Sequence, residues 1–346
     1  LKLSFWQGLK MKVDEKNITK KESITVEFFY NNTKDRFKIK LLNEQVGFER
    51  LIKEPNLHRP GLPLAGFLEL FSHNRVQVFG NTEIRYLSNL SETERVKSLD
   101  RLFKYNIPCL IITNDNSPTP EMIQLANKYQ TPIFGSDYST TKLIYFITDF
   151  LDDQFAPRLS IHGSFVDVYG VGMLFVGKSG IGKSEVALDL VERGHRLVAD
   201  DVVILTKKGE GILMGSGTDL VKHFMELRGI GIIDIRSMFG VRAIRFQKRL
   251  EIIIELEVWD DKAEYTRTGL DDSFTTLMDI EIPYVKLPII PGKNITVVSE
   301  IIALNYLLKH YGYDAAKVLT DRITKKIQLK NEEMNRSIDY FEHDFE

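Results

Sequence analysis

The sequence contains very little cysteine, since Cys109 is the only one among 346 residues. One thiol excludes an intrachain disulfide and a cysteine-based metal site, and its place in the apolar run 107–112 favours a buried side chain in a reducing compartment. No apolar run approaches the length of a membrane-spanning helix, and no signal peptide is evident. A net charge of −2 lacks the basic excess of a general nucleic-acid binder. We therefore expect a cytoplasmic protein that binds neither membranes nor nucleic acids.

The length and composition predict two domains. Apolar residues make up 43% of the chain and charged residues 27%, as in ordinary globular proteins. Residues 1–40 are lysine-rich and weakly patterned, with one plausible strand over 23–30, and we assign this N-terminal extension no role. An α/β domain is expected over 41–152, a polar linker over 153–158, and a catalytic domain with C-terminal helices over 159–346.

Strand and helix signals alternate along the first domain. The expected elements are strands over 75–79, 109–113 and 131–134, a helix after the capping box at Ser91, a helix after Thr119-Pro120, and a helix over 139–151. Short connections between alternating strands and helices predict a parallel sheet. No catalytic constellation stands out in this domain, so we expect it to serve binding, assembly or regulation.

The second domain contains a phosphate-loop motif. The stretch Gly177-Lys178-Ser179-Gly180-Ile181-Gly182-Lys183-Ser184 fits G-x-x-x-x-G-K-[ST] at every fixed position. The apolar run 171–176 predicts a buried strand before the loop, and the helical spacing after it predicts a helix that ends at Gly194. Backbone N–H groups in such a loop point at phosphate oxygens, while Lys183 reaches the β- and γ-phosphates and Ser184 ligates Mg²⁺. The motif predicts a nucleotide or polyphosphate site.

An aspartate pair follows the phosphate loop. The run 196–205 predicts one strand, in which Asp200 and Asp201 point to opposite faces, so that one of them faces the loop. An aspartate near a γ-phosphate can hold Mg²⁺ or accept the proton of an attacking hydroxyl. The alternative is a solvated pair at a strand end, although a carboxylate inside an apolar strand is costly unless something pairs with it.

The other candidate residues are ambiguous when taken one at a time. Glu226 and Arg228 would share one face of an extended segment, either close to a ligand, as the neighbouring glycines suggest, or as a surface ion pair. His162 precedes a strand, and a lone histidine there is more often structural than catalytic. Arg267 has no distinguishing context, because most arginines are simply solvated.

A series of motifs follows in order along the chain. They are Arg59-Pro60-Gly61, 64–66 and 75–77 in the first half, and His162-Gly163, 166–172, the phosphate loop, 193–201, 226–233, 265–267 and 288–294 in the second. Together they resemble HPr kinase/phosphorylase, the bifunctional sensor enzyme of bacterial carbon-catabolite control. The resemblance spans about residue 41 to the C-terminus.

This resemblance implies a fold, an activity and partners. The fold would be an N-terminal α/β domain like part of the Mur ligases, followed by a P-loop catalytic domain related to phosphoenolpyruvate carboxykinase. The enzyme would phosphorylate a serine of HPr, the phosphocarrier of the sugar phosphotransferase system, using ATP or pyrophosphate. It would also remove that phosphate by phosphorolysis, with inorganic phosphate as the attacking group and pyrophosphate as the product. The subunits would form a homohexamer that binds HPr across neighbouring copies.

The resemblance also implies roles for individual residues. The implied catalytic residues are His162, Lys183, Asp201 and Arg267. Asp201 would be the general base in phosphorylation and the general acid in the reverse direction. Ser184 and Glu226 would ligate Mg²⁺, and the phosphate loop, 177–184, would bind the phosphoryl donor.

A loop associated with phosphorolysis departs from the family pattern. This loop is Pro288-Ile289-Ile290-Pro291-Gly292-Lys293. The family usually has a basic residue where Ile290 stands and often arginine where Lys293 stands, so this chain has lost one charge and one forked donor for inorganic phosphate. Lys178 also departs, because an acidic residue is common at that position. The hypothesis is that kinase activity is retained, while phosphorylase activity is in question.

Two other functions fit the residues without the resemblance. One is a small-molecule kinase of the same architecture, which a panel of sugars and nucleosides would test by acceptor-dependent ADP release. The other is a nucleotide-gated regulatory protein whose N-terminal domain binds a partner. Asp201 argues against this second alternative, because a pure switch has no use for a catalytic base.

Overall fold

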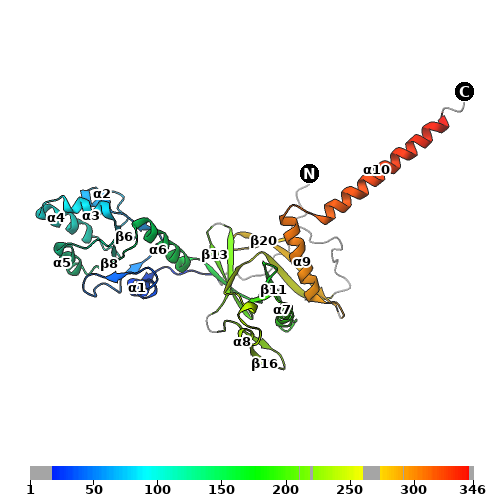
Figure 1. Cartoon of the computed structure of the whole chain (residues 1–346), viewed down its shortest axis with the longest axis horizontal. Coiled ribbons are helices and arrows are strands. Elements are labelled where there is room, and N and C mark those ends of the chain that lie inside the picture. Colours follow the sequence, from blue (N-terminus) through cyan, green and yellow to red (C-terminus); the bar gives the residue numbers. More distant parts are fainter. Residues whose placement is uncertain (1–17, 210, 219–220, 260–272, 291, 343–346) are drawn as a thin grey trace. The chain divides into compact units, whose positions relative to one another are not determined.

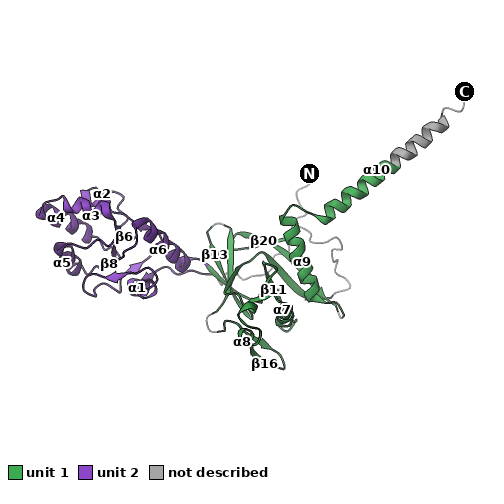
Figure 2. Cartoon of the chain, viewed as in Figure 1, with its two compact units in different colours: residues 1–18, 158–346 green, residues 19–157 purple. Residues whose placement is uncertain are grey.

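The chain folds into two compact units. In this computed structural model the described residues are 18–342, except 210, 219–220, 260–272 and 291, and side chains are described as far as residue 330. Unit 2 spans Thr19–Pro157, and the rest of the described chain from Arg158 onward belongs to unit 1 (Figure 2). No helix in the described part of the chain combines the length and the apolar character that crossing a membrane would require.

Unit 2 is an α/β unit built on a mainly parallel sheet. Its elements are β2 (Ile24–Thr25), α1 (Val26–Thr33), β3 (Lys40–Leu41), β4 (Leu51–Ile52), β5 (Leu57–His58), α2 (Gly61–Ala65), β6 (Val76–Phe79), α3 (Asn81–Ser88), α4 (Glu92–Phe103), β7 (Leu110–Ile112), α5 (Pro120–Lys128), β8 (Ile133–Gly135) and α6 (Thr140–Phe155). The sheet order is β3-β8-β7-β6-β5, with β5 to β8 parallel and β3 antiparallel. The predicted strands, the capping box at Ser91 and the proline start of α5 are therefore confirmed.

The beginning of unit 2 differs from the expected extension over 1–40 and its strand over 23–30. Only Ile24–Thr25 is strand, and α1 follows at once because the Thr25 hydroxyl accepts a hydrogen bond from the Phe28 N–H and caps the helix. Val26 and Phe29 are fully buried on one face of α1, inside the core of this unit. Residues 19–40 thus belong to the α/β unit.

The end of unit 2 also differs from the expected linker over 153–158. Helix α6 continues through Phe155, which is buried in the core together with Leu151, so the polar residues 152–154 are helical. The connection is Ala156-Pro157, and β9 begins at Arg158. The unit boundary at Pro157 lies inside the expected range, but the linker itself is shorter.

The described part of unit 1 contains a six-stranded sheet, a five-stranded sheet and the separate hairpin β15–β16, and helix α10 extends away from them (Figure 1). Its elements are β9 (Arg158–His162), β10 (Ser164–Val168), β11 (Val171–Gly177), α7 (Lys183–Glu192), β12 (Arg196–Ala199), β13 (Val202–Lys208), β14 (Ile212–Gly217), β15 (Phe224–Leu227), β16 (Gly231–Asp234), α8 (Ile235–Phe239), the 3-10 helix η2 (Val241–Ala243), β17 (Gln247–Arg249), β18 (Ile252–Val258), β19 (Phe274–Leu277), β20 (Ile280–Ile289), α9 (Ile295–His310) and α10 (Ala315–Glu342), and its smaller sheet is extended by β1 (Ile18–Thr19).

The larger sheet carries the phosphate loop. Its order is β12-β10-β11-β18-β20-β19, and the three central strands, β11, β18 and β20, are parallel. Helices α7 and α9 pack on one face of this sheet, and the smaller sheet, β1-β9-β13-β14-β17, packs on the other. The near-continuous burial of β11 follows from this position, because a strand covered on both faces has no polar side.

The expected single strand over 196–205 is two strands. The first part is β12, at the edge of the larger sheet, and the second is β13, in the smaller sheet. The chain changes sheets at Asp200 and Asp201, and Asp201 has a φ of 64°, a left-handed conformation that aspartate tolerates better than most residues. The period-two argument for this pair was therefore wrong, because no strand runs through it.

An ion-pair cluster fastens α9 to the end of α7. The Arg193 guanidinium donates from Nε and Nη2 to the Glu300 carboxylate at 3.1 and 2.8 Å, and His195 Nε2 lies 3.0 Å from Glu300 Oε1. The hydrogen bonds from Arg193 lower the pKa of Glu300. Because the carboxylate is 11% exposed, water screens this arrangement little.

We predict that Glu300→Gln destabilises unit 1 by about 2 kcal/mol at neutral pH, the size of a lost charge-assisted pair. A carboxyl with a depressed folded-state pKa contributes stability above its unfolded pKa, near 4.3, and loses it as the pH falls toward the folded value. The difference between wild type and variant should therefore shrink below about pH 4. Urea unfolding at several pH values measures it, with the exposed Glu192→Gln as the control. A pH-independent difference would contradict the ion-pair explanation.

Candidate active site

The phosphate loop joins the carboxyl end of β11 to the first turn of α7. The φ angles of Gly177, Gly180 and Gly182 are 143°, 78° and 103°, conformations that favour glycine and turn successive N–H groups inward. Lys183 is the first residue of α7, and its Nζ donates to the carbonyl oxygens of Gly177 and Lys178 at 3.3 and 3.2 Å. The ammonium group thus lies across the first half of the loop. The strand-loop-helix context predicted for residues 177–184 is confirmed.

A buried carboxylate lies directly beside the loop. The Ser184 hydroxyl donates to both oxygens of Asp200, at 3.1 and 2.9 Å, and the Ser164 hydroxyl donates to Oδ1 of the same carboxylate. Asp200 is 5% exposed, and this burial raises its pKa, while the two serine hydroxyls oppose the rise. Of the aspartate pair, Asp200 is therefore the one whose carboxylate contacts the phosphate loop.

Asp201 is exposed and faces His162. Its side chain is 71% exposed, and Oδ1 lies 3.5 Å from His162 Nδ1, which also lies 3.1 Å from the Asp201 carbonyl oxygen. The backbone holds the two residues together, because His162 pairs with Val202 between β9 and β13. Adjacent aspartates thus occupy different environments, one buried against the loop and one open to a reacting group.

The hairpin β15–β16 brings Arg228 to the phosphate loop. Glu226 lies on β15 with its side chain exposed, while the neighbouring Met225 and Leu227 are buried. Arg228 begins the turn of the hairpin and reaches the phosphate loop, where its Nη2 donates to the Ser179 hydroxyl at 3.4 Å. The alternative of a surface ion pair between Glu226 and Arg228 does not occur, because the guanidinium is directed at the loop.

The loop that follows β20 leaves the sheet at the same edge as the phosphate loop. Because β11, β18 and β20 are parallel, their carboxyl ends coincide: Gly177 pairs with Leu256, and Val258 pairs with Ile289. Pro288 and Ile289 are the last residues of β20, and Ile290, Gly292 and Lys293 follow. Pro291 and Arg267 lie outside the described residues, so the predicted role of Arg267 remains a prediction.

A divalent metal ion fits the residues around Ser184. No group of three or more histidine, cysteine, aspartate or glutamate side chains with metal-binding geometry occurs among the described residues. Mg²⁺, however, needs few protein ligands, because it keeps several waters and takes the remaining oxygens from phosphates. The hydroxyl of Ser184 already touches the Asp200 carboxylate, and together they present hard oxygen ligands beside the loop.

Sequence reasoning missed three participants of this site. The sequence did not show whether Asp200 or Asp201 faces the phosphate loop, because the change of sheets at that point has no sequence signal. Ser164 contacts Asp200 from β10, 36 residues away. Arg228 was noted for its spacing from Glu226, but the turn that directs it at the loop is a property of the hairpin. Its flanking glycines, Gly229 and Gly231, with φ of 84° and 97°, were the available signal.

A phosphate loop at a sheet edge, a buried carboxylate on its serine and an exposed acid nearby define a P-loop phosphotransferase. Two family models match the chain: HPr Serine kinase N terminus over residues 24–151 and HPr Serine kinase C-terminal domain over 153–323. The chain belongs to the HPr serine kinase family.

Named relatives match nearly the whole chain. An HPr kinase/phosphorylase of Chloroherpeton thalassium is 54% identical over 337 residues, covering 96% of this chain and 99% of the relative. One of Prosthecochloris aestuarii is 50% identical over 330 residues, covering 94% and 96%. A solved structure of the HPr(Ser) kinase/phosphatase from Coxiella burnetii aligns at 33% identity over 46% of this chain and 97% of its own, with a TM-score of 0.41.

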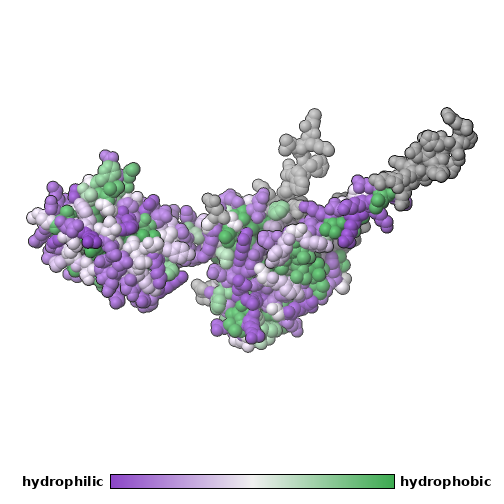
Figure 3. Space-filling model, turned by 45° about the horizontal axis from the view of Figure 1, so that its top comes forward, coloured by the Kyte–Doolittle hydropathy of each residue, from purple (hydrophilic) through white to green (hydrophobic). Residues whose placement is uncertain are grey.

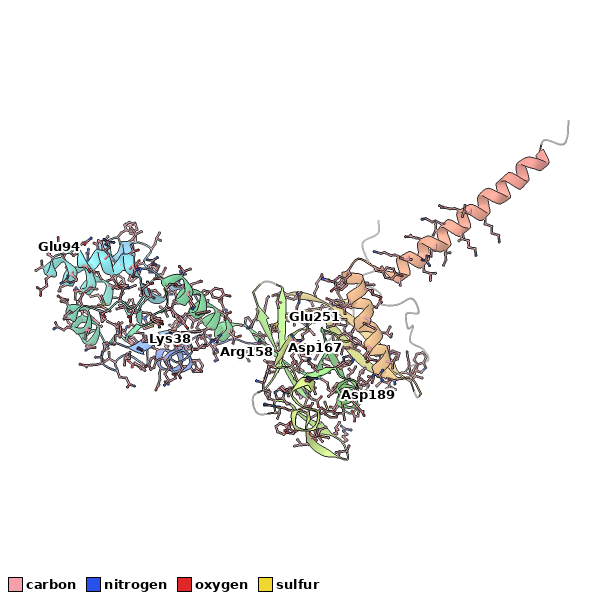
Figure 4. All side chains as sticks on the ribbon, in the orientation of Figure 1. Lys38, Glu94, Arg158, Asp167, Asp189 and Glu251 are labelled. Atoms are coloured by element: carbon pink, nitrogen blue, oxygen red, sulfur yellow. The ribbon has the colours of Figure 1, made fainter. Side chains whose placement is uncertain are left out.

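We predict that Asp200→Asn weakens Mg²⁺-dependent ADP binding by about 10- to 100-fold, the usual cost of losing a metal-site carboxylate. ADP affinity in EDTA should change little, because asparagine keeps the acceptor for the two serine hydroxyls. Calorimetry with and without Mg²⁺ measures both affinities. Asp189→Asn on α7 (Figure 4) removes the same charge outside the site and is the control. Equal losses in both buffers would mean that Asp200 only supports the loop.

Proposed function

We propose that this protein phosphorylates a serine of HPr with ATP or pyrophosphate and dephosphorylates it by phosphorolysis, as a sensor in carbon catabolite control. The observation that carries the proposal is the placement of Asp201, which lies beside His162 and one residue beyond the carboxylate that contacts Ser184. A phosphate donor in the loop and a base beside it are the two requirements of transfer to a hydroxyl. The names of the relatives at 50% and 54% identity support HPr as the acceptor.

In the proposed forward step the serine hydroxyl of HPr attacks the terminal phosphorus of the donor. A bond forms from the serine oxygen to phosphorus, and the bond to the bridging oxygen breaks, so ADP or phosphate leaves with the electron pair. Asp201 accepts the hydroxyl proton, and His162, 3.5 Å away, holds the carboxylate in position. Lys183 binds the β- and γ-phosphates from the loop, and Arg267 is a second cation for the attacking phosphate of the reverse reaction.

Mg²⁺ is the proposed cofactor, held by Ser184 and Glu226 and, on the geometry above, by Asp200. When bound, the ion neutralises charge on the phosphate oxygens. Glu226 is exposed on β15, and it can therefore turn toward a nucleotide in the loop without losing any described contact. Burial disfavours the charged form of Asp200, and a nearby cation would restore it.

The reverse step has a different requirement. Inorganic phosphate attacks the phosphoserine phosphorus, the serine oxygen leaves and receives a proton from Asp201, and pyrophosphate forms. The incoming dianion needs cations at the edge of the sheet, where Ile290 and Lys293 follow β20. Here Ile290 contributes no charge and Lys293 contributes a point charge. We infer that phosphorolysis is the slower direction in this protein.

Assembly and fold relationships form part of the same proposal. We propose a cytoplasmic homohexamer, with unit 2 similar to part of the Mur ligases and unit 1 similar to phosphoenolpyruvate carboxykinase. One helix face supports self-association: Val297, Ile301, Leu304 and Leu308 recur at helical spacing on α9 and are 38–58% exposed in the single chain. Figure 3 shows that apolar residues gather at places on the surface of unit 1.

We predict that Asp201→Asn lowers the rate of HPr phosphorylation by at least about 100-fold, the usual contribution of a positioned base. Nucleotide affinity should be retained, because the described contacts of the Asp201 side chain include no hydrogen bond or ion pair with the loop. Mass spectrometry of HPr after incubation with ATP and Mg²⁺ measures the transfer. Asp279→Asn is a matched control, since Asp279 also has a φ of 64° and its side chain is exposed. Near-normal transfer by the Asp201 variant would exclude it as the base.

We predict that Ile290→Arg raises kcat/KM for inorganic phosphate about tenfold, since a forked donor is added where the dianion enters. Pyrophosphate released from phosphorylated HPr is the quantity to measure, alongside the forward rate. Leu70→Arg adds the same charge to unit 2, where Leu70 is 95% exposed, and is the control. Phosphorolysis that is already as efficient as phosphorylation in the wild type would contradict the weakened-loop hypothesis.

A further inference from the structure

Arg228 is a cationic residue from outside the phosphate loop. Among the described residues, it is the cation from elsewhere in the chain whose side chain hydrogen-bonds to the loop. Its Nη2 donates to the Ser179 hydroxyl at 3.4 Å, and no described carboxylate forms an ion pair with it. An exposed arginine normally hydrogen-bonds to a carboxylate or to water. A guanidinium that points at an anion-binding loop is therefore positioned to bind an anionic ligand. Arg228 comes from the β15–β16 hairpin, and this contact links hairpin and loop.

The guanidinium lies against the backbone of the loop. A methyl group built on Gly180 would stand 2.6 Å from Arg228 Nη1 and 3.0 Å from its Cζ. Gly180 also has a φ of 78°. The absence of a side chain at Gly180 therefore creates the space that Arg228 occupies, in addition to permitting the turn.

The position along the loop identifies the part of the donor that Arg228 would meet. The helix N-terminus at Lys183 forms one end of the cradle, and the Lys183 ammonium, which reaches the β- and γ-phosphates in such loops, extends to the carbonyls of Gly177 and Lys178. The first half of the loop therefore faces the terminal phosphoryl group. Ser179 and Gly180 come directly after these two carbonyls, so Arg228 lies at the terminal end.

We propose that Arg228 is a catalytic residue that contacts the transferred phosphoryl group, exchanging its hydrogen bond to Ser179 for bonds to the phosphoryl oxygens when the donor binds. This inference rests on the proposed kinase function. In the transfer step, charge on the three equatorial oxygens changes as the bond to the leaving oxygen breaks, and a forked cation aimed at that position stabilises the transition state. The turn Leu227–Ile230, closed by the Ile230 N–H to the Leu227 carbonyl at 3.1 Å, fixes the base of the arginine.

The test is the variant Arg228→Met, which keeps the length of the side chain but removes its charge. Two readouts are needed: the rate of HPr phosphorylation, and the affinities for ADP and for a non-hydrolysable ATP analogue by calorimetry. The rate should fall by about 10²–10³. The analogue should bind at least about tenfold more weakly, while ADP affinity changes by less than about threefold, because ADP lacks the group that Arg228 contacts.

Two further variants separate the possible roles of this arginine. Arg242→Met removes an exposed charge from η2 and should leave both readouts unchanged. Arg228→Lys should recover less than a tenth of the phosphorylation rate that Arg228→Met loses relative to the wild type. The reason is that a point charge cannot make the forked contact. Equal weakening of ADP and of the analogue would overturn the proposal and make Arg228 a residue that braces the loop.

The affinity readout is independent of the protein acceptor. If the wild type discriminates the analogue from ADP and Arg228→Met abolishes that difference, the inference stands even where HPr is not phosphorylated. In that case the identity of the acceptor, and not the role of Arg228, is wrong. If Arg228→Met keeps the wild-type ratio of the affinities for the analogue and for ADP, the inference is wrong. HPr phosphorylation by the wild type would still be observed in that case.

Discussion

The contact between the Ser184 hydroxyl and the Asp200 carboxylate is the interaction on which the rest of the site depends. It joins the first turn of α7 to the point where the chain leaves the larger sheet for the smaller one. A carboxylate that is 5% exposed is tolerated there because the hydroxyls of Ser164 and Ser184 and the backbone of Asp201 donate to its oxygens. The phosphate loop, the aspartate pair and the strand β9 with His162 are thereby held in one place.

The change of sheets also separates two identical side chains by environment. Asp200 completes its hydrogen bonds inside the protein, whereas Asp201, one residue later, points outward because its backbone is left-handed. The Asp200 carboxylate is buried against the phosphate loop, and the Asp201 carboxylate is exposed to solvent. The two adjacent residues differ in this way because the chain changes sheets between β12 and β13.

Much of this arrangement was predictable from sequence, for local reasons. The phosphate loop, the helix caps and the alternation of unit 2 depend on residues that are neighbours in the chain, so pattern and spacing reveal them. The strand predicted over 23–30 was wrong because a threonine cap and the burial of Phe29 outweigh the extended propensity of the segment. The contacts of Ser164 with Asp200 and of Arg228 with Ser179 span 36 and 49 residues, and only the folded topology creates them.

The central strand β18 has a consequence for the geometry of the reaction. It lies between β11, which leads into the phosphate loop, and β20, whose last two residues begin the segment 288–293, and all three are parallel. Neighbouring strands are about 4.8 Å apart, so the two loops leave the sheet about 10 Å from each other. Strand β18 therefore fixes the spacing between the phosphate loop and the segment that follows β20. Sliding its register by two residues would displace one of these segments along the sheet by about 7 Å, so the pairing of β18 sets their position relative to each other.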